Sequence, residues 1–145
     1  MGKKRIIAGA GEDSTAEKKQ QVAVAPKIKK SIIKGVIHVA CTFNNTIVSV
    51  ADSKGNVVVW TSAGSMGFKG ARKSTPYAAT MIAKEAIERA KRFGLMEAAV
   101  IVKGIGSGRD AAVRGIAGSG ITISSISDDT PQAHNGVKPP KPRRV

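Results

Sequence analysis

The sequence predicts an α/β fold, with a mixed five-stranded sheet and two helices. Five short runs rich in Val, Ile or Ala either alternate between apolar and polar residues or are continuously apolar, as β-strands are. A longer segment between Thr75 and Gly94 repeats apolar residues every three or four positions, which is typical of an amphipathic helix. A second, shorter helical pattern separates the last two strands. The predicted order is therefore β-β-β-α-β-α-β.

The first half of the chain reads as an antiparallel meander. Asn44-Asn45 and Asp52–Gly55 supply its two turns, because Asn and Gly tolerate the backbone conformations that tight turns need. Cys41 is the only cysteine, so we expect no internal disulfide and interpret it as a small buried residue. The three strands are expected at 33–42, 46–51 and 56–62.

The long helix follows a basic loop that contains several glycines. Thr75 is expected to cap it, Pro76 to occupy its first position, where a missing N–H costs nothing, and Gly94 to end it. The positive end of the helix dipole and the basic side chains that precede it favour an anion. The basic residues just before the cap are Lys69, Arg72 and Lys73.

The second half predicts two strand–helix–strand crossovers. Residues 98–103 form an unbroken apolar run, which predicts a strand covered on both faces. The loop 104–108 leads into the helix 109–117, and the last strand is expected at 121–127. Parallel strands with right-handed crossovers would place this loop beside the basic loop. Its glycines would then present bare N–H groups, with Arg109 as a further cation.

The charge of the chain indicates a polyanionic partner. The 145 residues include 24 Lys and Arg against 10 Asp and Glu, a net charge of +14. Such an excess is typical of proteins that bind nucleic acid, and an anionic membrane surface fits less well. The sequence contains no apolar run of the length that spans a bilayer and no recognisable signal peptide. We therefore expect nucleic acid, and no membrane, as the partner.

The composition predicts one domain between two extensions. Residues 1–32 mix Lys with Gly, Gln and Ala without any period, so we expect a basic arm that is disordered alone. Its charge favours contact with RNA or DNA, and a tail that only keeps the protein in solution is the alternative. Residues 33–127 form the single α/β domain. Residues 128–145 contain four of the six prolines and four cations, so this tail should run extended.

Residues for catalysis are not found in the expected combinations. The segment 67–74 lies one residue from a phosphate-binding P-loop, but Arg72 stands where that loop needs glycine. The carboxylates are scattered, and His38 and His134 have no partner at metal-ligand spacing; His38 is interpreted as a strand residue with a satisfied ring. We expect no enzyme, metal or cofactor. A nuclease or phosphohydrolase that uses the same loops is the competing hypothesis, and a free RNA chaperone is a third.

Aromatic residues make up only 3% of the chain. Proteins that capture free single strands stack several bases on exposed rings, so contact with the phosphates and shape of folded RNA fits this sequence better. Trp60 and Phe93 are assigned to the core. Phe68, in the basic loop, is equally consistent with a wedge against a base and with packing on its own domain.

Four segments of the chain carry a recognisable pattern: FNNTIVSVADSKGN, TSAGSMGFKGARKSTPYAA, VKGIGSGRDAAVRG and DDTPQAHNGVKPPKPRRV. In this order they resemble the signatures of the family of bacterial-type protein eleven of the small ribosomal subunit. The resemblance covers 35–145 and departs from the family pattern mainly where Ile105, Ser107 and Ala133 replace a usual proline.

The resemblance implies a three-layer fold related to ribonuclease H, without the nuclease carboxylates. It also implies a structural constituent of the small ribosomal subunit, in the cytoplasm, that binds ribosomal RNA on the platform, bridges RNA helices and helps to form the Shine–Dalgarno cleft. The implied neighbours are ribosomal proteins seven and eighteen, with the mRNA leader and initiation factor three as further partners. The implied RNA-facing residues are Asn44, Asn45, Lys69, Arg72, Lys73, Ser74, Gly106, Gly108, Arg109, His134, Asn135, Lys138, Lys141, Arg143 and Arg144.

Overall fold

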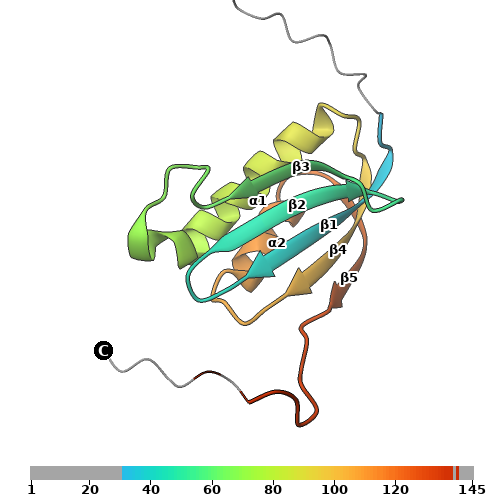
Figure 1. The fold of residues 1–145 in the computed structure, drawn as a ribbon. Helices are drawn as coiled ribbons and strands as arrows, with labels where there is room; N and C mark the ends of the chain where they lie inside the picture. The colour runs from blue at the N-terminus through green and yellow to red at the C-terminus, as the bar shows by residue number, and fades with distance from the viewer. Residues whose placement is uncertain (1–30, 139, 141–145) are drawn as a thin grey trace, which may run out of the picture.

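The computed structural model describes residues 31–138 and 140 (Figure 1). Almost all of the predicted arm and the last cations of the tail, Lys141, Arg143 and Arg144, lie outside the described residues. The order of strands and α-helices is the predicted one, and a short 3-10 helix in the basic loop was not expected. The elements are β1 (Lys34–Cys41), β2 (Thr46–Asp52), β3 (Val57–Ser62), η1 (Gly70–Ser74), α1 (Pro76–Lys91), β4 (Glu97–Lys103), α2 (Arg109–Ala117) and β5 (Thr122–Asp128).

The five strands form one mixed sheet in the order β3-β2-β1-β4-β5. β1 pairs antiparallel with β2, and β2 with β3, whereas β1 pairs parallel with β4 and β4 with β5. β1, β3, β4 and β5 therefore all run in one direction, and their carboxyl ends meet at one edge. We call this edge the loop end; it carries the loops 42–45, 63–75 and 104–108 and the start of the tail at 129.

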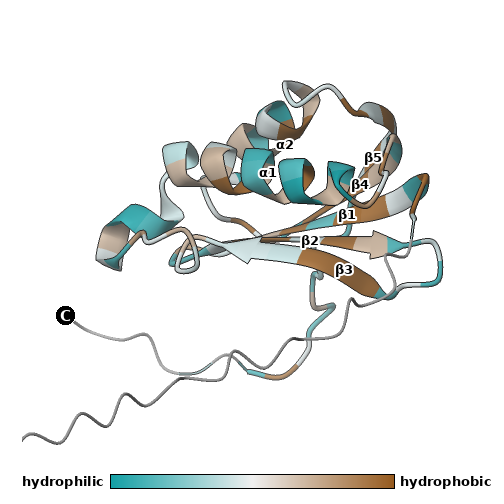
Figure 2. Cartoon of the chain, turned by 90° about the horizontal axis from the view of Figure 1, so that it is seen from above, coloured by the Kyte–Doolittle hydropathy of each residue, from teal (hydrophilic) through white to brown (hydrophobic). Residues whose placement is uncertain are grey.

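Both helices cover the same face of the sheet, with α1 over β2 and β3 and α2 beside α1 over β1 (Figure 2). Fully buried side chains from the sheet, such as Ile37 and Val100, pack there against Ile82, Ile87 and Ile116 of the helices. The resemblance implied three layers, but the described residues form only two. The described residues leave the second face of the sheet uncovered.

Trp60 lies on this uncovered face, and its assignment to the core is wrong. Its neighbours Val59 and Thr61 are buried under α1, and the alternation of the strand turns Trp60 the other way, with 60% of its surface exposed. His38 is also exposed there, without a hydrogen bond to its ring in the described part of the chain. β4 is covered on one face rather than two, because Ile101 is half-exposed beside His38.

The long helix begins and ends as its sequence predicts. Thr75 Oγ1 accepts a hydrogen bond from the Ala78 N–H at 3.3 Å, and Pro76 is the first helical residue. Gly94 follows the helix with a φ of +91°, a conformation that residues with a Cβ adopt at a cost. Its predicted apolar stripe is buried, Phe93 packs half-buried against the core, and Cys41 is buried as expected.

The position of Trp60 gives a test of the two-layer arrangement. Trp60→Ala should lower the free energy of unfolding by less than about 1 kcal/mol, because the ring lies on the uncovered face. Ile82→Ala should lower it by about 2–5 kcal/mol, because its side chain is fully buried between α1 and the sheet. Urea denaturation of the two variants measures both values. A loss for Trp60→Ala as large as that for Ile82→Ala would show that the ring is enclosed.

Candidate nucleic-acid interface

The loop end brings the two predicted phosphate-facing loops into direct contact. Ser107, in the loop before α2, donates a hydrogen bond from its hydroxyl to the carbonyl of Ser74, in the loop before α1, at 2.9 Å. The Gly106 N–H donates to the carbonyl of Cys41 at 3.1 Å, which ties the same loop to the end of β1. The prediction that the two loops lie side by side is therefore confirmed. The β1–β2 turn lies next to the loop 104–108 at the same edge.

Close packing explains the glycines of the 104–108 loop. A Cβ on Gly108 would lie 2.8 Å from the Ala79 Cβ and 2.9 Å from Thr46 Oγ1, so any side chain there would collide with α1 and β2. Gly104 has a φ of +102°, and Gly106 lies directly against the backbone of Thr42. Gly106 and Gly108 are both buried, and the Gly106 N–H is already bonded. The expectation of bare N–H groups is thus wrong for Gly106.

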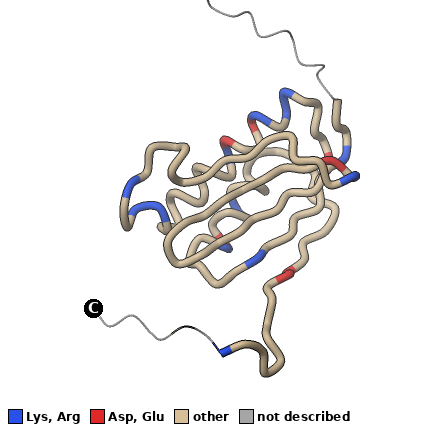
Figure 3. Tube along the Cα trace, viewed as in Figure 1, with Lys and Arg blue, Asp and Glu red and all other residues tan. Residues whose placement is uncertain are grey.

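The basic loop holds the cations that are available to a ligand. Lys69 and Arg72 are exposed and Lys73 is half-exposed, and none of the three forms an ion pair within the described residues. Figure 3 shows Lys and Arg in this loop, at the left of the view, without an acidic residue among them. The 3-10 helix Gly70–Ser74 gives the loop a regular backbone. The loop therefore presents a concentrated positive charge to the solvent.

The start of α1 contributes less backbone hydrogen bonding than expected. Pro76 has no N–H, and the Ala78 N–H is taken by the Thr75 hydroxyl. The Thr75 hydroxyl in turn donates to the Arg72 carbonyl at 2.9 Å. Few first-turn N–H groups are left, so anion binding at this point depends on the basic side chains and on the helix dipole.

The guanidinium of Arg109 is taken up by contacts within the domain. It forms an ion pair with Asp128 at the end of β5, and its Nη1 donates to the Gly104 carbonyl at 2.6 Å and to Thr130 Oγ1 at 3.3 Å. The Thr130 hydroxyl and then the Arg109 guanidinium hold the pKa of Asp128 below its ordinary value. The pKa of Arg109 is raised by the same ion pair. Arg109 thus fixes the root of the tail to the 104–108 loop.

A network of hydrogen bonds fixes the β1–β2 turn. Thr42 Oγ1 accepts from the Asn45 N–H at 3.0 Å and from the Asn44 N–H at 3.4 Å, and it donates to the Asn45 carbonyl at 3.1 Å. Asn45 is half-buried, and its Oδ1 accepts from the Thr46 N–H at 3.0 Å. Asn45 therefore has a structural task in the turn, whereas Asn44 is exposed.

The tail leaves the domain from the same end. The Asp129 N–H donates to the Val102 carbonyl at 2.9 Å, and Thr130 Oγ1 accepts from the Gly104 N–H at 3.1 Å. Beyond this anchor the described residues contain no helix or strand, and His134, Asn135 and Lys138 are all exposed. The tail carries its exposed polar groups away from the sheet (Figure 1).

Sequence reasoning did not select three exposed residues of the loop end. Lys103 ends β4 and adds another cation, while Phe43 and Ile105 expose 70% and 64% of their surface. Nothing in the sequence pattern distinguished Phe43 from a core residue, because it follows an apolar strand directly. Phe68, the residue expected as a possible wedge against a base, packs half-buried against the core. Its ring stands edge-on to the ring of Tyr77, with the two ring centroids 6.3 Å apart.

The described residues offer little to the competing hypothesis of an enzyme. They contain no group of three or more His, Cys, Asp or Glu residues that could hold a metal ion. A hollow of about 500 Å³ lies between α2 and β5, with Val102, Val113 and Ile126 among the residues that line it. Of its two carboxylates, Asp128 is paired with Arg109. No helix among the described residues is long and apolar enough to cross a membrane.

Comparison with known proteins identifies the family. The family model described as Ribosomal protein S11 matches residues 35–144. The chain belongs to the ribosomal protein S11 family. The small ribosomal subunit protein uS11 of Sulfurovum sp. (strain NBC37-1) is 54% identical over 120 residues, which are 82% of this chain and 97% of that protein. The S11 family consists of structural ribosomal proteins rather than enzymes, so this protein is an RNA-binding component of the small ribosomal subunit.

The contact at Gly108 gives a test of how the S11 loops are held together. Gly108→Ala should lower the free energy of unfolding by about 1–3 kcal/mol, because the new methyl group collides with Ala79 and Thr46. Gly64→Ala is the matched control, since its nearest neighbour would lie 3.9 Å away. Chemical denaturation measures both. Equal stability of the two variants would contradict the close packing.

The lowered pKa of Asp128 predicts that the stability of the protein depends on pH. Because the folded-state pKa is depressed, its contribution is present above the ordinary pKa of an aspartate and is lost as the pH falls through the folded value. Asp128→Asn should therefore lower the melting temperature at pH 7, and the difference from wild type should shrink as the pH falls through the folded-state pKa of Asp128. Asp129→Asn, at an exposed neighbouring position, is the control. If the melting temperatures of Asp128→Asn and wild type still differed in acid, the charge of Asp128 would not be the cause of the stabilisation.

Proposed function

We propose that this protein binds ribosomal RNA through its loop end and holds separate RNA helices together on the platform of the small subunit. The observation that supports the proposal best is the convergence of two loops at one edge, with Lys69, Arg72 and Lys73 free of ion pairs in the described part of the chain. A cluster of unpaired cations on a rigid frame suits a phosphate backbone.

The proposed contact residues fall into two groups. The first group faces the RNA directly and consists of Asn44, Lys69, Arg72, Lys73, His134, Asn135 and Lys138, which are exposed or half-exposed, together with Lys141, Arg143 and Arg144, which lie outside the described residues. The second group positions the first: Asn45, Ser74, Gly106, Gly108 and Arg109 hold the turn, the loops and the tail root through the bonds described above.

The divergence of the basic segments supports the proposed bridging of RNA helices. The basic loop lies beside α1, whereas the tail leaves from the end of β5 on the other side of the loop end (Figure 1). Two basic segments that start at the loop end and point in different directions can each contact the backbone of a different RNA helix. The proposal extends to the Shine–Dalgarno cleft, with the mRNA leader and initiation factor three as partners, to ribosomal proteins seven and eighteen as neighbours, and to a cytoplasmic ribosome. These details rest on the family resemblance.

Removal of two loop cations tests the RNA binding. Arg72→Ala combined with Lys73→Ala should weaken binding to small-subunit ribosomal RNA and flatten the salt dependence, by about 0.7–0.9 units of log K against log salt for each phosphate that the variant no longer binds. Lys54→Ala combined with Lys84→Ala changes the net charge equally, but lies outside the loop end and should keep the slope. Filter binding across a salt series measures both. An unchanged slope for the loop variant would count against the proposed phosphate binding.

Sedimentation tests the place of the protein in the cell. In a lysate of cells that express a tagged chain, the protein should move with the small subunits through a sucrose gradient at low and moderate salt. Recovery only in the soluble fractions at the top of the gradient would contradict the proposal.

A further inference from the structure

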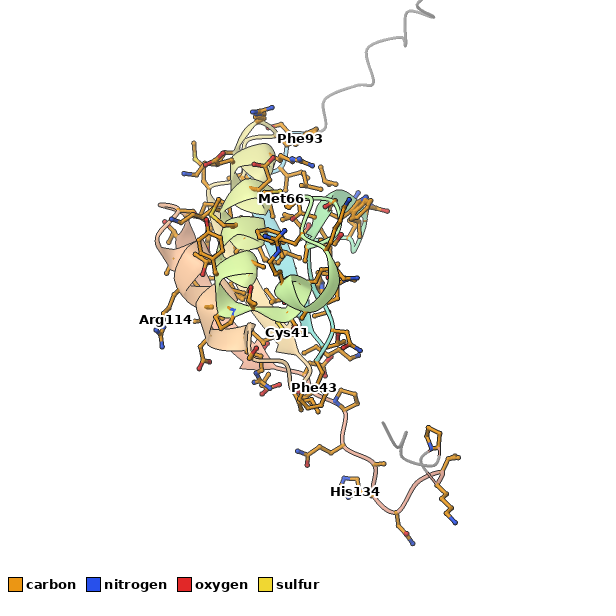
Figure 4. The ribbon with its side chains drawn as sticks, turned by 90° about the vertical axis from the view of Figure 1, so that its left-hand side faces the viewer. Cys41, Phe43, Met66, Phe93, Arg114 and His134 are labelled. Carbon is orange, nitrogen blue, oxygen red and sulfur yellow. The ribbon has the colours of Figure 1, made fainter. Side chains whose placement is uncertain are left out.

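Phe43 is the most unusual side chain of the loop end. It stands in the β1–β2 turn with 70% of its surface exposed, and Figure 4 shows it at the end of the molecule from which the tail leaves. The three hydrogen bonds of Thr42 Oγ1 fix the turn backbone on both sides of the ring. An aromatic side chain on a rigid turn loses little conformational entropy when it binds, so the ring is preorganised for a partner.

Ile105 is a second exposed apolar residue of the loop end, in the adjacent loop 104–108. Gly106 lies against the backbone of Thr42, so the residues that follow Thr42 and precede Gly106 flank one point of contact. These residues are Phe43 and Ile105, and Ile105 exposes 64% of its surface. The loop end therefore exposes two apolar side chains from adjacent loops, in addition to Tyr77 and Ile47, which are 67% and 42% exposed.

The surrounding charges indicate what these apolar side chains bind. Lys69, Arg72, Lys73 and Lys103 lie at the same end, and they suit the phosphates of RNA. Phosphate contacts give no reason for an exposed Phe ring. A regular A-form duplex presents phosphates, ribose and base edges, and only an unpaired nucleotide offers the face of its base.

We propose that Phe43, with Ile105 beside it, forms a binding site for one unpaired base of the RNA, which stacks on the Phe43 ring. The proposal rests on RNA binding by the loop end and adds that the protein requires a loop, bulge or splayed nucleotide at this point. Asn44, exposed next in the turn, has an amide that can bond the edge of such a base.

The experiment compares Phe43→Leu and Phe43→Tyr in binding to the small-subunit ribosomal RNA of the same organism. Leu keeps apolar bulk but cannot stack, so its affinity should fall by about 5- to 150-fold, the range that one base–aromatic stack covers. Tyr should bind within about three-fold of wild type. The salt slope should stay unchanged in both, because neither substitution removes a cation that binds phosphate. Chemical probing of the bound RNA should show one unpaired base that wild type and Phe43→Tyr protect and Phe43→Leu exposes.

Met96→Ala is the control, because Met96 exposes 71% of its surface at the opposite end of the sheet, and its affinity should not change. Phe43→Leu binding within two-fold of wild type, or a flatter salt slope, would overturn the base site. The base site would also be overturned if Phe43→Leu bound the RNA normally but failed to join assembled subunits. That result would assign Phe43 to a contact with another protein. Failure of the wild-type protein itself to bind the RNA would instead contradict the proposed function, and the base site with it.

Discussion

The close contact of Gly108 with Ala79 and Thr46 is the constraint on which the arrangement of the loop end depends. It lets the beginning of α2 touch both the first turn of α1 and the start of β2, at distances that any side chain would prevent. The bond from Ser107 to Ser74 then joins the two loops directly. Because β1, β3, β4 and β5 run in one direction, the three loops and the tail all leave the sheet at this same edge.

The loop end separates the residues that hold the frame from those that present charge. Arg109 has the same side chain as Arg72, but its guanidinium is bonded to Asp128, Gly104 and Thr130, and its charge is matched by a carboxylate. Arg72 has no such partner within the described residues. A cation that must bind a polyanion has to stay unpaired, and one that must anchor a tail has to be paired, so the structure assigns the two residues different tasks.

Much of this could be predicted from the sequence, because the decisive signals are local. The cap at Thr75, the order of the elements along the chain and the adjacency of the loops follow from turn chemistry, periodicity and the handedness of crossovers. Trp60 was misplaced because alternation shows that a strand has two faces, but does not show which of them a helix will cover. The pairing of Arg109 depends on Asp128, 19 residues later in the chain. Phe43 was missed because its exposure depends on how three separate loops meet.

Hydrogen–deuterium exchange of the protein, free and bound to small-subunit ribosomal RNA, tests the central claim most directly. If the loop end is the RNA-binding surface, bound RNA should slow exchange in residues 42–45, 69–75 and 104–109 and in the tail from 129. The turn 52–56 and the segment 93–96, at the opposite end of the sheet, should exchange at the same rate in both states. Protection of that opposite end, with unchanged exchange in the three loops, would contradict the account.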